Sequence, residues 1–132
     1  MPDTAADATF VARAVEEFAE RVVVAVDVRG GRLMIDGWRE EGPALEAAIA
    51  GLNDVGAPRY LVTAIARDGT LDGPDLTLYR QVLKLTYRPV IASGGVRNAE
   101  DVWALRDLGC EAAVTGKALY EKTLKLSQVT RG

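Results

Sequence analysis

The sequence has no histidine and a single cysteine, Cys110, among its 132 residues. The lack of histidine excludes His-based triads, histidine metal ligands and imidazole acid–base chemistry, so any proton transfer falls to carboxylates, Lys, Tyr or Cys. One cysteine excludes an internal disulfide, and its position just before an apolar strand favours a small packing residue over a reactive thiol. We therefore predict neither a metal centre nor a cofactor.

Long apolar runs and basic clusters are missing as well. No stretch approaches the roughly 20 apolar residues that span a bilayer, and the N-terminus has neither a basic region nor an apolar signal core. The net charge is −3, with Lys and Arg scattered among Asp and Glu, which argues against a nucleic-acid footprint. We expect a cytoplasmic protein that binds neither nucleic acid nor membrane.

The sequence does contain enough apolar residues, 48% of the chain, for one core, which predicts one domain over residues 1–132. A leading helix is expected around residues 10–20, and a hairpin with a two-glycine turn over residues 28–35. Strands are expected at residues 22–26, 59–65, 89–93 and 111–115, each followed in the chain by a helix, the last one around residues 119–129. This alternation predicts an α/β fold with four parallel strands.

Two strand-to-helix turns near the end of the chain contain glycine. Ser93-Gly94-Gly95 follows a short β-branched strand and precedes a helix capped by Asn98 and stopped by Gly109, and Thr115-Gly116-Lys117 repeats the pattern one βα unit later. Backbone N–H groups at such turns bind anions, and βα barrels place a phosphate site after their last two strands. The alternative for each turn is a tight connection without a ligand.

Polar and aromatic side chains stand at or near the ends of the other two strands. Asp27 ends the first strand, which is a catalytic position in barrel enzymes; the alternative is that it caps or orients neighbouring backbone. Asp68 lies in the loop-like stretch 66–74, where turn chemistry is the alternative to a functional role. Thr63 lies inside a strand, where a packing role is the alternative to a catalytic one. Trp38 follows Gly37 on a loop, and either stacks on a flat substrate ring or covers the barrel mouth.

Five motifs together resemble one family. They are Val26-Asp27, Gly37-Trp38, Thr63-x4-Asp68-Gly69-Thr70-Leu71-x-Gly73-Pro74, Ile91-Ala92-Ser93-Gly94-Gly95-Val96 and Gly116-Lys117-Ala118-Leu119-Tyr120. They resemble the phosphoribosyl isomerases of histidine biosynthesis, most closely the actinobacterial dual-substrate type. Members are (βα)8 barrels that convert an aminoaldose into an aminoketose, by Amadori rearrangement of a bis-phosphorylated aminoimidazole carboxamide ribonucleotide. The resemblance covers nearly the whole chain but only the second half of the barrel, which implies a four-stranded parallel half-barrel.

The resemblance also implies residue roles. Asp68 resembles the general acid–base aspartate of the second half, Asp27 the carboxylate ending the fifth strand, and Thr63 the threonine on the sixth. The implied substrate-binding residues are Trp38, Ser93, Gly94, Gly95, Gly116 and Lys117, the last four of which contribute to one phosphate site. Opening a ribose ring needs an acid and forming the enol needs a base, so two carboxylates must face each other across the sugar. In the family the partner carboxylate ends the first strand, which these residues do not include.

Two positions depart from the family pattern. Asp36 stands where dual-substrate members have an arginine two residues before the tryptophan, which argues against a second, tryptophan-pathway activity. Ala64 stands where many members have an aspartate. The alternative functions are a non-catalytic half-barrel that folds, oligomerises and binds phosphate, and half of the sister cyclase of imidazole glycerol phosphate synthase, which shares the Arg67-Asp68-Gly69-Thr70 turn.

Four parallel strands cannot close a barrel. They therefore leave two unpaired edges, expected at residues 22–26 and 111–115. One expected outcome is closure, either as a homodimer or with a complementing N-terminal half-barrel. The other is an open, flavodoxin-like sheet with helices on both faces, the leading helix covering the would-be barrel interior. The expected ligand is a phosphorylated ribonucleotide or a phosphate ion.

Overall fold

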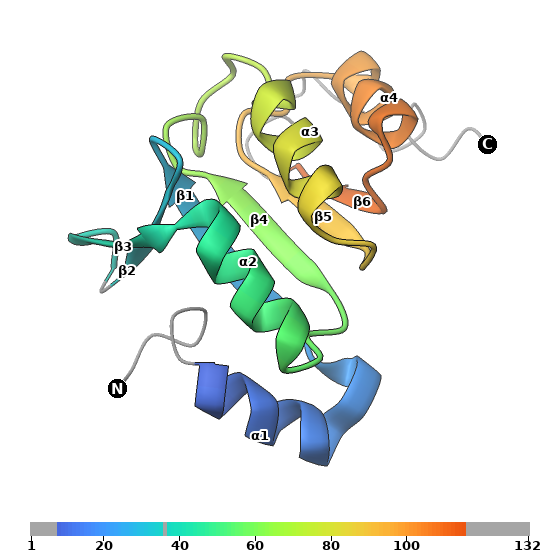
Figure 1. Ribbon diagram of the computed structural model, residues 1–132. Coiled ribbons are helices and arrows are strands. Elements are labelled where there is room, and N and C mark those ends of the chain that lie inside the picture. The colour runs from blue at the N-terminus through green and yellow to red at the C-terminus, as the bar shows by residue number, and fades with distance from the viewer. Residues whose placement is uncertain (1–7, 36, 116–132) are drawn as a thin grey trace.

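The structure is a computed structural model that describes residues 8–35 and 37–115. Its strands are β1 (Val24–Arg29), β2 (Arg32–Ile35), β3 (Glu40–Ala44), β4 (Tyr60–Ala64), β5 (Val90–Ser93) and β6 (Ala112–Val114). Its helices are α1 (Ala8–Phe18), the short 3-10 helix η1 (Ala19–Arg21), α2 (Leu45–Asp54), α3 (Leu76–Leu85) and α4 (Ala99–Leu108). The strands form one sheet in the order β3-β2-β1-β4-β5-β6 (Figure 1). The predicted α/β class is confirmed, and the sheet has six strands instead of four.

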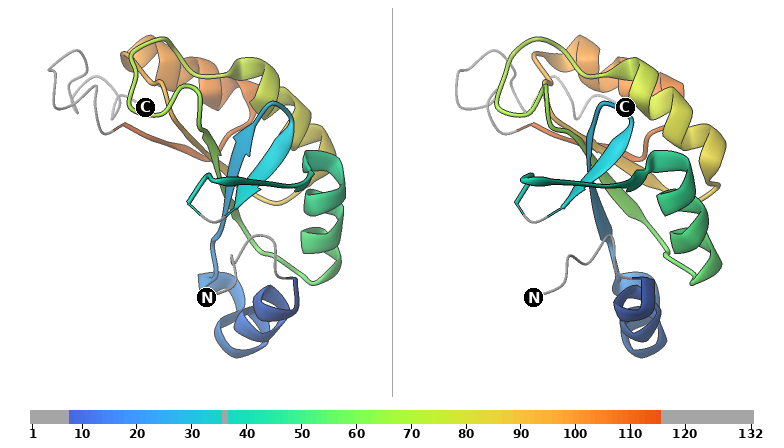
Figure 2. Two further views of the ribbon diagram at one scale, coloured as in Figure 1. Left: turned by 90° about the vertical axis from the view of Figure 1, so that its left-hand side faces the viewer. Right: turned by 60° about the vertical axis from the view of Figure 1, so that its left-hand side comes forward.

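The predicted parallel strands are four consecutive strands of this sheet, from β1 to the edge strand β6. Strands β1, β4, β5 and β6 pair in parallel, each with the next. Helix α3 connects β4 to β5 and α4 connects β5 to β6. Helices α2, α3 and α4 lie on one side of the sheet, as both views in Figure 2 show. Helix α1 lies beyond the amino ends of the strands beside α2, so among the described helices none covers the opposite face, contrary to the flavodoxin-like alternative.

The segment between β1 and α2 differs from the prediction. The expected hairpin is present, with Gly30-Gly31 as the turn between β1 and β2. However, a further strand, β3, pairs antiparallel with β2, where only a loop and the start of a helix were expected. Strand β3 has the sequence Glu-Glu-Gly-Pro-Ala, which lacks apolar alternation. Its extended form comes from pairing with β2 and from the bond that the Arg32 side chain donates to the Gly42 carbonyl at 3.1 Å, since its own propensity opposes it.

One edge of the described sheet is the strand predicted at residues 111–115, and the other differs from the prediction. The described sheet ends at β3 and β6, so β1 is not its outermost strand. Along β1, however, only Val28 and Arg29 pair with β2, and the outer side of the first half of β1 has no partner strand among the described residues. Strand β3 is protected by exposed Glu40, Glu41 and Pro43, since charge and proline oppose further pairing. Strand β6 is short and apolar and carries no such protection.

The two faces of the sheet have different surroundings. The hydrophobic core lies between the sheet and helices α2, α3 and α4, and Val24, Val26 and Val62 point into it, each fully buried. The alternate residues form what we call the open face: the row Ala25, Leu61, Ile91 and Ala112, followed by the row Asp27, Thr63, Ser93 and Val114. A parallel sheet in a folded protein normally has both faces covered. Within residues 8–35 and 37–115, no helix supplies such a cover over the open face.

Several features named from the sequence lie outside the described residues: Asp7, a cap residue that the sequence predicts for the leading helix, and Asp36, Gly116, Lys117 and the closing helix at residues 119–129. Over residues 8–35 and 37–115, no helix combines the length and the apolar character needed to cross a membrane.

Candidate functional site

The pairing register brings three of the predicted site residues into one row. Asp27 on β1 pairs with Thr63 on β4, which pairs with Ser93 on β5. Because side chains alternate between the faces of a strand, all three point to the open face. They lie near the carboxyl ends of their strands, where βα enzymes place their active sites. One carboxylate and two hydroxyls thus lie side by side across the sheet.

Asp27 also contacts Trp38, which sequence reasoning had treated separately. The indole Nε1 of Trp38 donates a hydrogen bond to Oδ2 of Asp27 at 2.7 Å. Gly37 and Trp38 have φ angles of 63° and 72°, so a left-handed turn at the end of the β2 segment directs the ring towards β1. Trp38 remains 37% exposed. Its N–H therefore has a partner in the protein, while part of the ring surface is available to a ligand.

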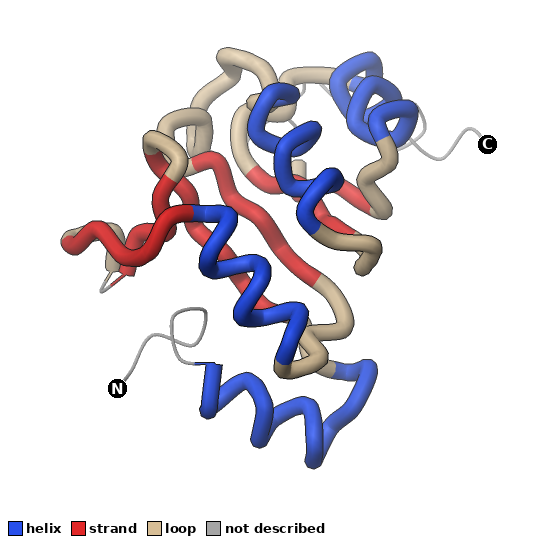
Figure 3. Tube along the Cα trace, in the orientation of Figure 1, coloured by secondary structure: helices blue, strands red, loops and turns tan. Residues whose placement is uncertain are grey.

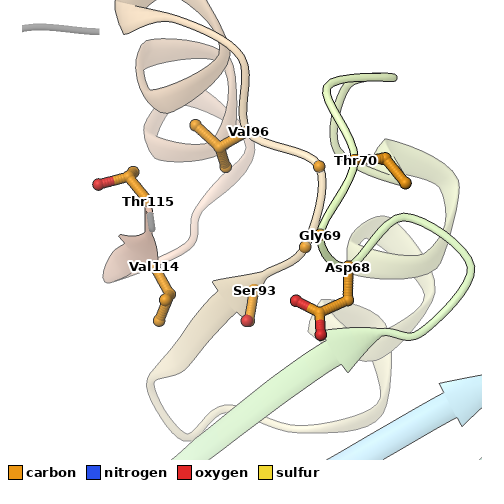
Figure 4. Close-up of a pocket in the computed structure, with 9 residues that line it drawn as sticks. Asp68, Gly69, Thr70, Ser93, Val96, Val114 and Thr115 are labelled. Carbon is orange, nitrogen blue, oxygen red and sulfur yellow. The ribbon is translucent and has the colours of Figure 1, made fainter. Parts of the chain in front are cut away.

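A cavity of about 180 Å³ lies between the loop after β4 and the turn after β5 (Figure 4). The lining residues are Asp68, Gly69, Thr70, Ser93, Gly94, Gly95, Val96, Val114 and Thr115. The carboxylate of Asp68 and the hydroxyl of Ser93 lie beside each other in Figure 4, with Val114 and Thr115 across from them. Asp68 comes from the long loop between β4 and α3, drawn in tan in Figure 3. The predicted acid–base residue and the predicted glycine turn thus share one cavity.

The glycine turn packs directly on the loop that carries Asp68. Gly94 and Gly95 have φ angles of 107° and 84°, which residues with a side chain rarely adopt. A Cβ atom at Gly94 would lie 2.8 Å from the carbonyl oxygen of Ala64, and one at Gly95 would overlap the carbonyl oxygen of Gly73. Sequence reasoning had assigned these glycines to phosphate binding. The structure adds a packing reason, because only a bare backbone lets the two loops touch.

The turn that lines this cavity has backbone donors without a described partner. Within the described part of the chain, the N–H groups of Gly94, Gly95 and Val96 donate no hydrogen bond. Helix α4 follows directly, with Asn98 as its predicted N-cap accepting from the N–H of Asp101 at 3.0 Å. Free backbone N–H groups at such a turn form a site suited to a phosphate or another anion.

Two arginines near the cavity are engaged in holding the loops. The side chain of Arg97 donates to both carboxylate oxygens of Asp101, at 2.9 Å and 3.0 Å, and its backbone N–H donates to the same group at 2.8 Å. Burial alone would raise the pKa of Asp101, but the bonds from Arg97 outweigh it and hold the pKa below its usual value. Nη1 of Arg67 donates to the Gly73 carbonyl at 2.7 Å. Among the described groups, an anion in the cavity would therefore depend chiefly on backbone donors.

Cys110 is a buried free thiol in the hydrophobic core. Burial raises the pKa of this thiol to about 11, so it is almost wholly protonated at neutral pH and is no nucleophile. The predicted packing role fits this position. Among the residues that the structure describes, no group of His, Cys, Asp and Glu side chains is arranged to hold a metal ion.

The sequence does not mark Tyr79 as a site residue, because its spacing with Leu76, Val82 and Leu83 predicts only the apolar face of a helix. The structure places the hydroxyl of Tyr79 against the backbone of Ser93, at the start of the glycine turn. The one available signal was chemical: a tyrosine at a buried helical position needs a hydrogen-bond partner for its hydroxyl.

The fold and the site define a βα protein with carboxylates, hydroxyls and free backbone donors gathered at the carboxyl ends of its parallel strands. A family model described as "Histidine biosynthesis protein" matches residues 3–125. The chain belongs to this family.

Named relatives are similar over almost all of this chain. It is 43% identical over 125 residues to phosphoribosyl isomerase A of Streptomyces griseus, covering 92% of this chain and 52% of the relative. It is 44% identical over 125 residues to an imidazole-4-carboxamide isomerase of Renibacterium salmoninarum, whose full name contains two 5-phosphoribosyl groups, covering 92% of this chain and 51% of the relative. The chain spans about half the length of the relatives it matches. The resemblance stated from the motifs is confirmed.

Proposed function

We propose that this chain supplies the second half of a phosphoribosyl isomerase of histidine biosynthesis. The proposed reaction is the Amadori rearrangement of a bis-phosphorylated aminoimidazole carboxamide ribonucleotide from aminoaldose to aminoketose. The observation that carries the proposal is the gathering of Asp27, Asp68 and the Gly94-Gly95 turn at one end of the sheet, in a chain whose relatives are named as isomerases. Those names also favour the isomerase over the sister cyclase.

The residues of the site have distinct proposed roles. Asp68 exchanges protons with the sugar, because ring opening needs an acid at the ring oxygen and enol formation needs a base at the adjacent carbon. Asp27 and Thr63 contact the opened chain from the row beside it. Trp38 lies against the flat imidazole ring, using the ring surface that its bond to Asp27 leaves free. We propose no metal or cofactor for this chemistry, which needs only proton transfer.

One of the two substrate phosphates binds at the glycine turn. The free N–H groups of Gly94, Gly95 and Val96 support this, as does the hydroxyl of Ser93 in the same cavity. Gly116 and Lys117 complete the site in the proposal, from the turn after β6. The second phosphate and the second carboxylate must come from elsewhere, since each step of the proton transfer needs a group on the opposite side of the sugar.

The missing half is proposed to cover the open face. Ala25, Leu61, Ile91 and Ala112 form an apolar row without described helices over it. Either a complementing first half-barrel or a second copy of this chain fits this surface. Loss of a general acid or base removes about 10²–10⁴-fold of rate, so we propose that the isolated chain is weakly active or inactive. The non-catalytic alternative, a half-barrel that only folds, oligomerises and binds phosphate, predicts no rate in any assembly.

A steady-state isomerase assay with and without an added first half-barrel tests this proposal. We expect turnover to rise by about 10²-fold or more when the first half of a relative such as the Streptomyces griseus isomerase is present. A complex that forms but does not turn over would support the non-catalytic alternative. Full activity of the chain alone would show that no first half-barrel is needed. With the tryptophan-pathway substrate in place of the histidine-pathway one, we expect no turnover, because Asp36 stands where dual-substrate relatives have an arginine.

We further propose that the chain on its own assembles as a homodimer through the open face and the free strand edges. Two copies would supply 264 residues (132 doubled), close to the roughly 250 of a complete barrel. Sedimentation equilibrium should give the dimer mass, and Ile91→Glu should give a monomer because it places a charge on the apolar row. Tyr87→Glu is the control, since Tyr87 is fully exposed in the connection between α3 and β5. A wild-type monomer at tens of micromolar would contradict the homodimer.

A further inference from the structure

The hydroxyl of Tyr79 lies at the junction between β5 and the glycine turn. Tyr79 is on α3 and is fully buried. Its Oη donates to the carbonyl oxygen of Ser93 at 2.7 Å and accepts from the N–H of the same residue at 3.2 Å, while the Val62 carbonyl oxygen is 3.4 Å away. One side chain from a helix thus satisfies both backbone groups of the last residue of β5.

This position matters because Ser93 joins two different backbone environments. Before it, β5 is held in the sheet by its ladders to β4 and β6. After it come the three N–H groups of Gly94, Gly95 and Val96, which have no acceptor among the described residues. A glycine pair has the widest backbone freedom of any dipeptide. The direction in which these donors point therefore depends on how firmly the residue before them is held.

We infer that Tyr79 is a positioning residue for the anion site: its hydroxyl fixes Ser93 and thereby directs the N–H groups of the glycine turn into the cavity. Tyr79 does not line the cavity and would not touch the ligand. The inference rests on the proposed phosphate site, and extends it to a residue on the other side of the sheet.

The chemistry of the hydroxyl suits this role. Burial raises the pKa of Tyr79 well above its usual value, so the group keeps its proton at neutral pH and remains a donor. Without the hydroxyl, the N–H and the carbonyl of Ser93 would both be buried without that partner, and an unpaired buried group is costly. The end of β5 would then shift to find other partners, and the turn would move with it.

Tyr60 provides a matched control within the same core. It is also fully buried, and its hydroxyl donates to Oδ1 of Asn53 at 2.6 Å. Burial raises the pKa of Tyr60 to about 12. Tyr60 begins β4 at the amino end of the sheet, whereas Tyr79 acts at the carboxyl end. Tyr60→Phe and Tyr79→Phe each remove one buried, hydrogen-bonded hydroxyl and keep the ring.

The test compares these two variants with the wild-type chain in three measurements. Denaturant unfolding gives stability, amide hydrogen exchange reports on Ser93 to Val96, and NMR titration with inorganic phosphate gives affinity. We expect both variants to lose comparable stability. Only Tyr79→Phe should speed exchange at Ser93 to Val96 relative to the rest of the core and weaken phosphate binding, by about tenfold, the loss of one well-placed hydrogen bond.

Equal changes at Ser93 to Val96 in both variants would overturn the inference, because Tyr79 would then act only through overall stability. Unchanged exchange and unchanged affinity in Tyr79→Phe would overturn it as well. A wild-type chain that binds no phosphate would refute the proposed phosphate site, and the exchange comparison would then decide the role of Tyr79 alone. If Tyr79→Phe is too unstable, the same series in trimethylamine N-oxide, which favours the folded state, retains the comparison.

Discussion

Replacing Asp68 with asparagine should lower the isomerase rate of the complemented chain by about 10²-fold or more, with almost no change in stability. The substitution removes the group that exchanges protons with the sugar but keeps its size and its turn propensity. The bonds that hold this residue in the loop come from its backbone N–H, which donates to the carbonyl oxygens of Ala64 at 3.0 Å and Ile65 at 3.2 Å. The substitution leaves both backbone bonds in place, so the reaction rate should fall while the stability is unchanged.

Asp72→Asn is the matched control for this experiment. Asp72 is an exposed aspartate in the same loop that does not line the cavity, so its loss of charge should leave the rate within about twofold. Steady-state kinetics and denaturant unfolding on both variants separate the chemical effect from the structural one. If Asp68→Asn keeps full activity while Asp27→Asn abolishes it, the two carboxylates have the opposite roles.

The second large effect is expected from Gly95→Ala, which should destabilise the chain by about 2–5 kcal/mol. A left-handed backbone costs a residue with a side chain about 1–2 kcal/mol, and overpacking against a fixed backbone adds about 1–3 kcal/mol. The added Cβ would overlap the Gly73 carbonyl oxygen, so the Asp68 loop must move away from the turn. Isomerase activity of the complemented chain should therefore fall together with stability.

Gly31→Ala separates the two contributions to this loss. Gly31 has a φ angle of 77°, close to the 84° of Gly95, but a Cβ atom there would have nothing within 4 Å. It should cost only the backbone term, about 1–2 kcal/mol, and leave activity unchanged. Denaturant unfolding of both variants measures the difference. Equal losses would mean that the turn and the Asp68 loop are not in close contact.

The sequence alone was sufficient to predict the parallel strands and the helices between them, because these elements depend on local signals. Apolar runs too short for a helix predicted β4 and β5, and periodic apolar spacing predicted α2 and α3. Asn98 and Gly109 marked the ends of α4, and the structure shows them as its caps. The position of Asp68 on a loop followed from the turn residues of the stretch 66–74. The residues proposed for the site could be named because family motifs accompany these elements.

Only the tertiary structure decided the features that depend on contacts between segments distant in the chain. Strand β3 exists because β2 offers it a partner, and nothing in Glu-Glu-Gly-Pro-Ala signals extended backbone. The bond from Trp38 to Asp27 depends on a left-handed turn that no propensity predicts for tryptophan. Two further features depend on how two βα units pack together. One is the close packing of Gly94 and Gly95 on the Asp68 loop, and the other is the pair of hydrogen bonds between Tyr79 and Ser93. Local sequence sets which backbone shapes are favourable, but which groups touch is set by packing and by the need of each buried polar group for a partner.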